Sequence, residues 1–121
     1  MARILIVDDS SYARRVYRAI IERAGHTVIE ASTGTAAIET FTLERPDIVL
    51  LDLSMEDISG LDVLRTLRAL DANARVIVVS ADVQKTTSHA VLEAGASQFV
   101  HKPASADDLV AAVSTLVGET Q

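Results

Sequence analysis

The chain has 121 residues, of which 49% are hydrophobic and 23% charged, a composition typical of one folded domain rather than of a disordered segment. Its 17 acidic and 11 basic side chains give a net charge of −6, which argues against nucleic acid as a direct partner because phosphate binding needs a basic surface. The absence of cysteine excludes disulfides and thiolate metal sites. The apolar run near the N-terminus is too short for a signal peptide or a membrane span. We therefore expect a single cytoplasmic domain over residues 1–121 that makes no membrane contact.

Short β-branched runs alternate with longer segments of helical periodicity, which is typical of parallel βαβ units. In chain order, the predicted strands cover residues 3–7, 27–31, 47–51, 75–79 and 98–101. The runs ILIV, IVLL and VIVV within them are apolar throughout, as expected for central strands covered by helices on both faces.

The predicted helices lie between these strands and after the last one. They begin at Ser10 or Ser11, at Thr33, at Ser59, near residue 84 and at Ser105, where Asp108 three residues later completes a capping box. Gly25, Pro46 and Gly95 follow the first, second and fourth helices and favour their ends there. The pattern predicts an α/β fold with a five-stranded, doubly wound parallel sheet and helices on both faces.

Two of the apolar strands run directly into acidic residues. Asp8 and Asp9 follow ILIV, and Asp52 follows IVLL. Because the carboxyl ends of parallel strands meet at one edge of the sheet, we expect the three carboxylates to lie close together. Their mutual repulsion calls for a cation, and oxygen ligands without His or Cys favour Mg²⁺.

A hydroxyl and an ammonium group follow the last two strands. Ser80 comes after VIVV and Lys102 after FVH, so both are expected at the same edge as the acids. Together with a metal these groups would form an anion pocket for which phosphate is a natural ligand. The pattern therefore indicates transfer of a phosphoryl group to a carboxylate.

These residues, taken in order, resemble the motifs of response-regulator receiver domains. The motifs are Asp8-Asp9, Asp52 with Met55 and Gly60 after it, Ser80-Ala81 and Lys102-Pro103, and the resemblance covers the chain from residue 2 to about residue 118. It implies the flavodoxin-like strand order 2-1-3-4-5, a cis peptide bond before Pro103, and a stand-alone receiver of the chemotaxis or phosphorelay type.

The resemblance also implies a role for each site residue. Asp52 is the expected phosphoacceptor, with Lys102 and Ser80 assisting the transfer. The remaining assignments are Mg²⁺ ligation by Asp8, Asp9, Asp52 and the backbone carbonyl of Ser54, switching by Ser80 and Phe99, and tuning of the phosphoryl lifetime by Ser54 and Asp82.

By the same resemblance, the phosphoryl donor is a histidine kinase or a histidine phosphotransfer protein. A downstream target is expected to dock on the fourth helix, fifth strand and fifth helix, with the chain a monomer or a phosphorylation-dependent dimer. The chain is then no enzyme beyond its own phosphorylation and dephosphorylation. Two alternatives remain: an Mg²⁺-dependent aspartyl-phosphate hydrolase, disfavoured because such enzymes carry a second Asp where Ser54 stands, and an interaction module that is never phosphorylated.

The loop after the third strand departs from the family pattern. Glu56 and Asp57 follow Met55, where the family commonly has proline first. The absence of proline predicts a looser loop. Two hypotheses stay open at this point: the added acids tune metal affinity or phosphoryl lifetime, or they form a solvated acidic loop.

Overall fold

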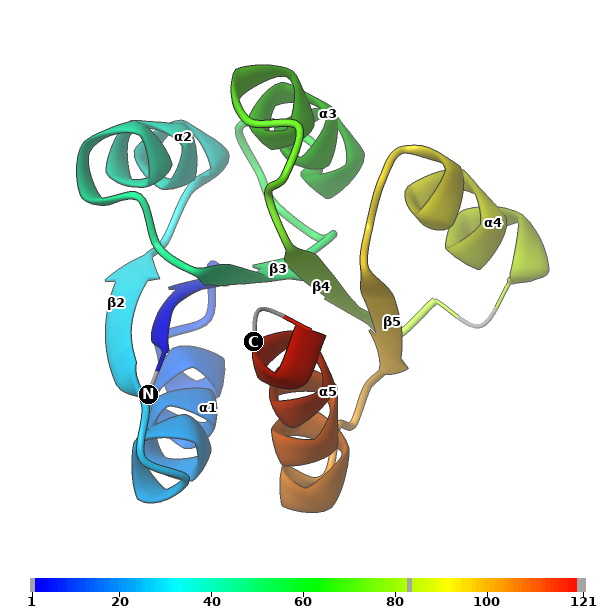
Figure 1. Ribbon diagram of the computed structural model, residues 1–121. Helices are drawn as coiled ribbons and strands as arrows, with labels where there is room; N and C mark the ends of the chain where they lie inside the picture. Colours follow the sequence, from blue (N-terminus) through cyan, green and yellow to red (C-terminus); the bar gives the residue numbers. More distant parts are fainter. Residues whose placement is uncertain (1, 83, 120–121) are drawn as a thin grey trace.

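The structure is a computed structural model that describes residues 2–82 and 84–119. Five parallel strands form one sheet in the order β2-β1-β3-β4-β5, and five helices connect and cover them (Figure 1). The strands are β1 (Arg3–Val7), β2 (Thr27–Ala31), β3 (Ile48–Asp52), β4 (Val76–Ser80) and β5 (Gln98–His101). The helices are α1 (Ser11–Arg23), α2 (Gly34–Glu44), α3 (Gly60–Leu70), α4 (Lys85–Glu93) and α5 (Ala106–Glu119). The predicted fold class and strand order are confirmed.

Two strands end one residue later than the sequence predicts. β3 ends at Asp52 rather than at residue 51, and β4 ends at Ser80 rather than at residue 79. The reason is that the parallel ladder continues to these residues: Asp52 lies in register with Val79, and Ser80 with His101. The acid and the hydroxyl therefore belong to the sheet itself and are held by its backbone, whereas Asp8 and Lys102 follow the ends of their strands.

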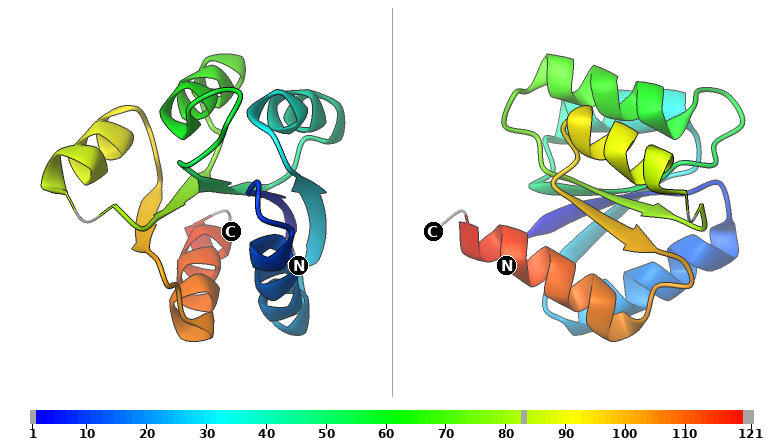
Figure 2. Two further views of the ribbon diagram at one scale, coloured as in Figure 1. Left: turned by 180° about the vertical axis from the view of Figure 1, so that it is seen from behind. Right: turned by 90° about the vertical axis from the view of Figure 1, so that its right-hand side faces the viewer.

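The sheet lies between two layers of helices, with α2, α3 and α4 on one face and α1 and α5 on the other (Figures 1 and 2). Alternate residues of the central strands serve the two layers, as a strand's period of two requires. Leu5, Val49 and Val78 pack with the first layer, whereas Ile6 and Leu50 pack with the second. Both faces of β1, β3 and β4 are thus buried, which explains their continuously apolar sequences.

Side-chain caps confirm four of the predicted helix starts, and α4 begins at Lys85 without such a cap. Ser10, Thr33, Ser59 and Ser105 each accept a hydrogen bond from the backbone N–H three residues later. α1 is followed by Gly25, whose φ of 96° lies in the region that glycine adopts at low cost. Within the described part of the chain, no helix has the length and apolar character needed to cross a membrane.

Candidate functional site

Three carboxylates meet at the carboxyl edge of the sheet, as the sequence predicts. One oxygen from each of Asp8, Asp9 and Asp52 lies within 4.8 Å of the others. Asp8 and Asp52 are 2% and 5% exposed, whereas Asp9 is open to solvent. Buried carboxylates this close are stable only with cationic partners, and a set of oxygen donors alone suits Mg²⁺.

Lys102 places its ammonium group against two of these acids. Its Nζ lies 3.2 Å from Asp8 Oδ2 and 3.4 Å from Asp52 Oδ1. Partial burial lowers the pKa of Lys102, but the carboxylates of Asp52 and Asp8 outweigh burial, and the net pKa is raised above its usual value. Lys102 is therefore held as a cation beside Asp8 and Asp52.

Lys102 does not fully neutralise the cluster. Burial, followed by the charge of Asp8, raises the pKa of Asp52, although the Ser54 amide and Lys102 act in the opposite direction. The N–H of Ser54 donates to Asp52 Oδ1 over 3.3 Å. Three carboxylates facing one ammonium leave an excess of negative charge, so the residues present fit a divalent cation.

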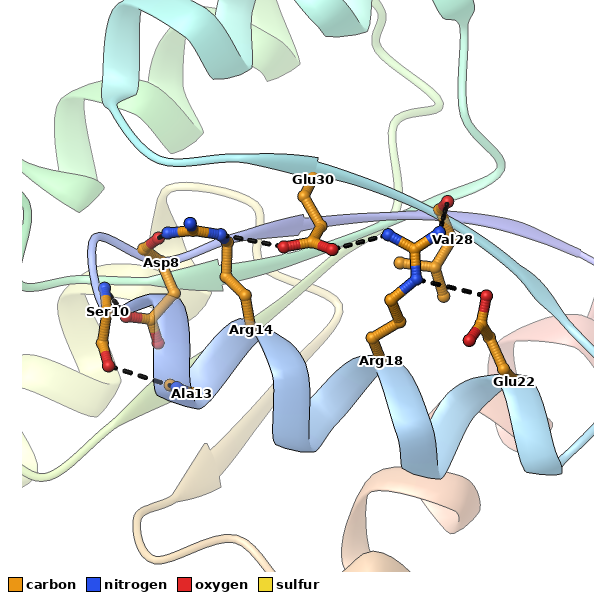
Figure 3. Close-up of polar contacts among 8 residues, drawn as sticks. All are labelled: Asp8, Ser10, Ala13, Arg14, Arg18, Glu22, Val28 and Glu30. Atoms are coloured by element: carbon orange, nitrogen blue, oxygen red, sulfur yellow. Dashed lines mark hydrogen bonds and ion pairs between the residues drawn. The ribbon is translucent and has the colours of Figure 1, made fainter.

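The loop that carries Asp8 and Asp9 is held from α1 (Figure 3). Asp8 Oδ1 accepts from the N–H of Ser10 over 2.9 Å, and the main-chain carbonyl of Asp8 accepts from Arg14 Nη1 over 2.7 Å. Arg14 is in turn oriented by Glu30 of β2, which also pairs with Arg18 over 2.6 Å. The hydrogen bond from Arg18, together with that from Arg14, lowers the pKa of Glu30, so this carboxylate stays charged and keeps Arg14 in place.

The switch residues predicted by the resemblance lie on β4 and β5. Ser80 is 3% exposed, its Oγ accepts from the N–H of Asp82 over 3.1 Å, and its carbonyl accepts from the N–H of Lys102 over 2.9 Å. Phe99 lies on β5 in register with Val78 and is partly buried. Its ring meets that of His101 edge-on, with centroids 4.8 Å apart. Ser80 and Phe99 therefore lie on neighbouring strands, with Phe99 two residues before the residue that pairs with Ser80.

Asp82 begins the connection to α4. Its carboxylate accepts from Thr87 Oγ1 over 2.6 Å and from the N–H of Gln84 over 2.9 Å, and these two bonds lower its pKa. The structure thus gives this carboxylate the role of tying the start of α4 to the end of β4. The lifetime roles of Asp82 and of Ser54, whose side chain is exposed, stay predictions.

The two acids of the loop after β3, Glu56 and Asp57, are both exposed, but they differ in their contacts. The carboxylate of Asp57 accepts hydrogen bonds from Gly34 and Thr35 at the start of α2. These bonds hold the pKa of Asp57 far below its usual range. Asp57 is thus exposed, as the interpretation of a solvated acidic loop expects, and it is also bonded to α2; whether the two acids tune metal affinity or phosphoryl lifetime stays a prediction.

Comparison with known proteins agrees with this geometry. The sequence model of one protein family, the response regulator receiver domain, matches residues 4–114 of this chain. The chain belongs to the response-regulator receiver family. This receiver is 35% identical over 113 residues to the chemotaxis protein CheY of Bacillus subtilis, a match that covers 93% of this chain and 94% of that protein.

Solved receiver structures share the fold. A receiver domain of the Francisella response regulator 1452 superimposes with a TM-score of 0.95 at 25% identity, over all of both chains. The CheY chain of a CheX-CheY-BeF3-Mg²⁺ complex from Borrelia burgdorferi superimposes with a TM-score of 0.91 at 30% identity, over 95% of this chain and 88% of that one. Receivers act as signalling switches in two-component systems and generally bind Mg²⁺, and the acidic cluster of this receiver can hold such a metal.

The structure thus brings together Asp8, Asp9, Asp52 and Lys102, and it confirms the expected cis bond between Lys102 and Pro103. Sequence reasoning missed two residues that bear on this receiver's site, Arg14 and Tyr17, and it missed the bonds of Asp57 to α2. Burial raises the pKa of Tyr17, and its phenol lies in the electrostatic field of Lys102 and the buried acids. Arg14 and Asp57 act through contacts with backbone groups, which leave no pattern in the sequence.

Proposed function

We propose that this receiver is a phosphoacceptor switch in which Asp52 takes a phosphoryl group from a phosphohistidine of a histidine kinase or phosphotransfer protein. The observation that supports the proposal most directly is the placement of Lys102 Nζ within 3.4 Å of Asp52 and 3.2 Å of Asp8 at the carboxyl edge of the sheet. A cation fixed beside one buried carboxylate is suited to stabilise charge on a group transferred to it.

In the proposed reaction, an oxygen of Asp52 attacks the phosphorus atom of the donor. A phosphorus–oxygen bond forms, the phosphorus–nitrogen bond to the donor imidazole breaks, and the imidazole leaves with the bonding electron pair. In this proposal Lys102, beside Asp52, would stabilise charge on the new phosphoryl oxygens, and the hydroxyl of Ser80, at the end of the neighbouring strand β4, would donate to one of them afterwards.

The proposed metal ligands are the carboxylates of Asp8, Asp9 and Asp52 and the backbone carbonyl of Ser54. Mg²⁺ bound there supplies positive charge that offsets the repulsion among the acids and the charge of the phosphoryl group. The CheY chain from Borrelia burgdorferi, whose complex contains Mg²⁺ and BeF3, supports this proposal by similarity.

The proposed output is a change of the surface formed by α4, β5 and α5, where a target protein would dock. Phosphorylation adds negative charge and strong acceptor oxygens next to Ser80, and movement of that hydroxyl frees space toward Phe99. A pocket of about 330 Å³ already lies along β5 and α5 beside Phe99 and His101. Two discrete packings of Phe99 would then correspond to two docking states.

The test is intact-mass measurement after incubation with acetyl phosphate and Mg²⁺. We expect a gain of one phosphoryl group in the wild type and none in Asp52→Asn or in the metal-free sample, because the acceptor carboxylate or the metal is then missing. An Asp52→Asn protein that gains the group at the wild-type rate would contradict the assignment of the acceptor. Turnover of an added phosphomonoester would favour a hydrolase instead.

A further inference from the structure

The start of α2 is completed by a residue from another loop. Asp57 Oδ1 accepts from the N–H of Gly34 over 2.9 Å, and Oδ2 accepts from the N–H and the hydroxyl of Thr35 over 3.0 and 2.8 Å. The helix's own cap, Thr33, binds the next two amides. A carboxylate at the N-terminus of a helix is also favoured by the helix dipole.

Gly34, the first residue of α2, lies so close to this loop and to α3 that a side chain there would be crowded. A Cβ at Gly34 would lie 2.9 Å from Val63 Cγ2, 3.0 Å from Ile58 Cβ and 3.3 Å from Asp57 Oδ1. The backbone of α2 therefore packs directly on residues 57 and 58 and on α3. The loop after β3 is thus fitted against α2 as well as bonded to it.

The same loop begins at the phosphoacceptor. Asp52 Oδ1 accepts from the N–H of Ser54, and the carbonyl of Leu53 accepts from the N–H groups of Met55 and Gly60 over 3.1 and 3.2 Å. These bonds fix the two ends of the loop, at β3 and at the start of α3. Asp57 adds a tie in its middle, three residues after Ser54.

We propose that Asp57 is a positioning residue for the metal site: by capping α2 it holds the loop that carries Ser54, so that Mg²⁺ affinity depends on a side chain that does not touch the metal. The inference rests on the proposed function, because it takes Ser54 as a ligand. It assigns to Asp57 the restraint that proline gives to this loop in other receivers.

The test is isothermal titration calorimetry of Mg²⁺ with the wild type, Asp57→Ala, Asp57→Asn and Glu56→Gln, with circular dichroism and urea unfolding on the same samples. We expect Asp57→Ala to weaken Mg²⁺ binding about tenfold, as loss of a group that orients metal ligands does. Asp57→Asn keeps an acceptor oxygen and is expected to fall between Asp57→Ala and the wild type. Glu56→Gln removes an equal charge one residue away without breaking the cap, and we expect its affinity to stay near that of the wild type.

A purely structural cap would lower the urea midpoint of Asp57→Ala but leave the Mg²⁺ affinity of the folded protein unchanged, and that result would overturn the inference. Equal weakening in Asp57→Ala and Glu56→Gln would also overturn it, because charge alone would then explain the effect. If Asp57→Ala does not fold, Thr35→Val removes one of the three bonds, and an affinity about threefold weaker is expected; an unchanged affinity would overturn the inference.

Different results would show that the proposed phosphoacceptor function, rather than the positioning role of Asp57, is wrong. A wild type that binds Mg²⁺ in an Asp57-dependent manner, yet gains no phosphoryl group from acetyl phosphate or a kinase, would refute phosphoacceptor function and leave the positioning role standing. A wild type that binds no Mg²⁺ would refute both.

Discussion

Asp52 lies at a position where its charge opposes folding. The side chain is 5% exposed and close to a second buried acid, Asp8, while Lys102 offsets only part of the repulsion. Burial and the neighbouring charge raise its pKa, which means that the folded protein holds the Asp52 proton more tightly than the unfolded chain does. The chemistry of the site thus depends on a carboxylate that destabilises the metal-free fold.

We therefore expect Asp52→Asn to stabilise the metal-free protein at pH 7, by roughly 1 kcal/mol, a typical size for one substitution. Because the folded pKa lies above the unfolded pKa, the cost of the wild-type charge is fully present above the folded pKa and disappears as the pH falls toward the unfolded pKa. Urea unfolding with EDTA at pH 7 and at pH 4 measures the difference. An advantage of Asp52→Asn that grows as the pH falls would contradict this account.

The principal site residues could be predicted from the sequence because each stands at a strand end. Asp8, Asp52, Ser80 and Lys102 follow or close apolar runs whose direction is fixed by the parallel fold, so their meeting at one edge follows from topology. The bonds of Asp57 could not be predicted, because its partners in α2 lie more than twenty residues away in sequence and include backbone N–H groups. Such a contact depends on how closely two loops pack, which periodicity does not reveal.

We call the edge of the sheet that carries Asp8, Asp9 and Asp52 the acid edge. The start of α3 packs closely against the end of β3 there. α3 begins at Gly60, where a Cβ would lie 2.4 Å from Leu53 Cα and 2.8 Å from the carbonyl oxygen of Asp52. β3 lies one residue later than the sequence predicts, and the carbonyl of its last residue, Asp52, lies against the start of α3. The glycine is therefore needed so that α3 can start directly against the end of β3.

We expect Gly60→Ala to destabilise the protein by about 2 kcal/mol or more, because the clash is with backbone atoms that move only with β3 or α3. The same shift displaces Asp52, so phosphoryl uptake from acetyl phosphate should fall as well. Urea unfolding and intact-mass kinetics measure the two effects.

Gly118 in α5 is the matched control, since a Cβ there meets no heavy atom of the described residues within 4 Å. Gly118→Ala should leave phosphoryl uptake unchanged and add stability of at most about 1 kcal/mol, because alanine is the better helix former. If Gly60→Ala behaved like Gly118→Ala, close packing at the start of α3 would not be what requires glycine at residue 60.

Both helical layers of the fold hold segments that carry the clustered acids at the acid edge. Arg14 of α1, in the layer with α5, holds the carbonyl of Asp8, and Asp57 ties the loop after β3 to α2 in the other layer. Neutralising the acids therefore relieves repulsion between segments that are anchored on opposite faces of the sheet. A ligand bound at this edge should stabilise the fold as a unit.

We accordingly expect Mg²⁺ to raise the thermal midpoint of the wild type, because a ligand that binds only the folded state adds stability that grows with the logarithm of its concentration. At one hundred times its dissociation constant the gain is about 2.7 kcal/mol. Asp9→Asn should lose most of this gain while changing the metal-free midpoint little, since Asp9 is exposed whereas Asp8 and Asp52 are buried. Differential scanning calorimetry over a range of MgCl₂ concentrations, with EDTA and KCl at matched ionic strength as controls, measures the effect. Equal gains in KCl and MgCl₂ would show that screening of the net negative charge, rather than a bound cation at the acid edge, stabilises this receiver.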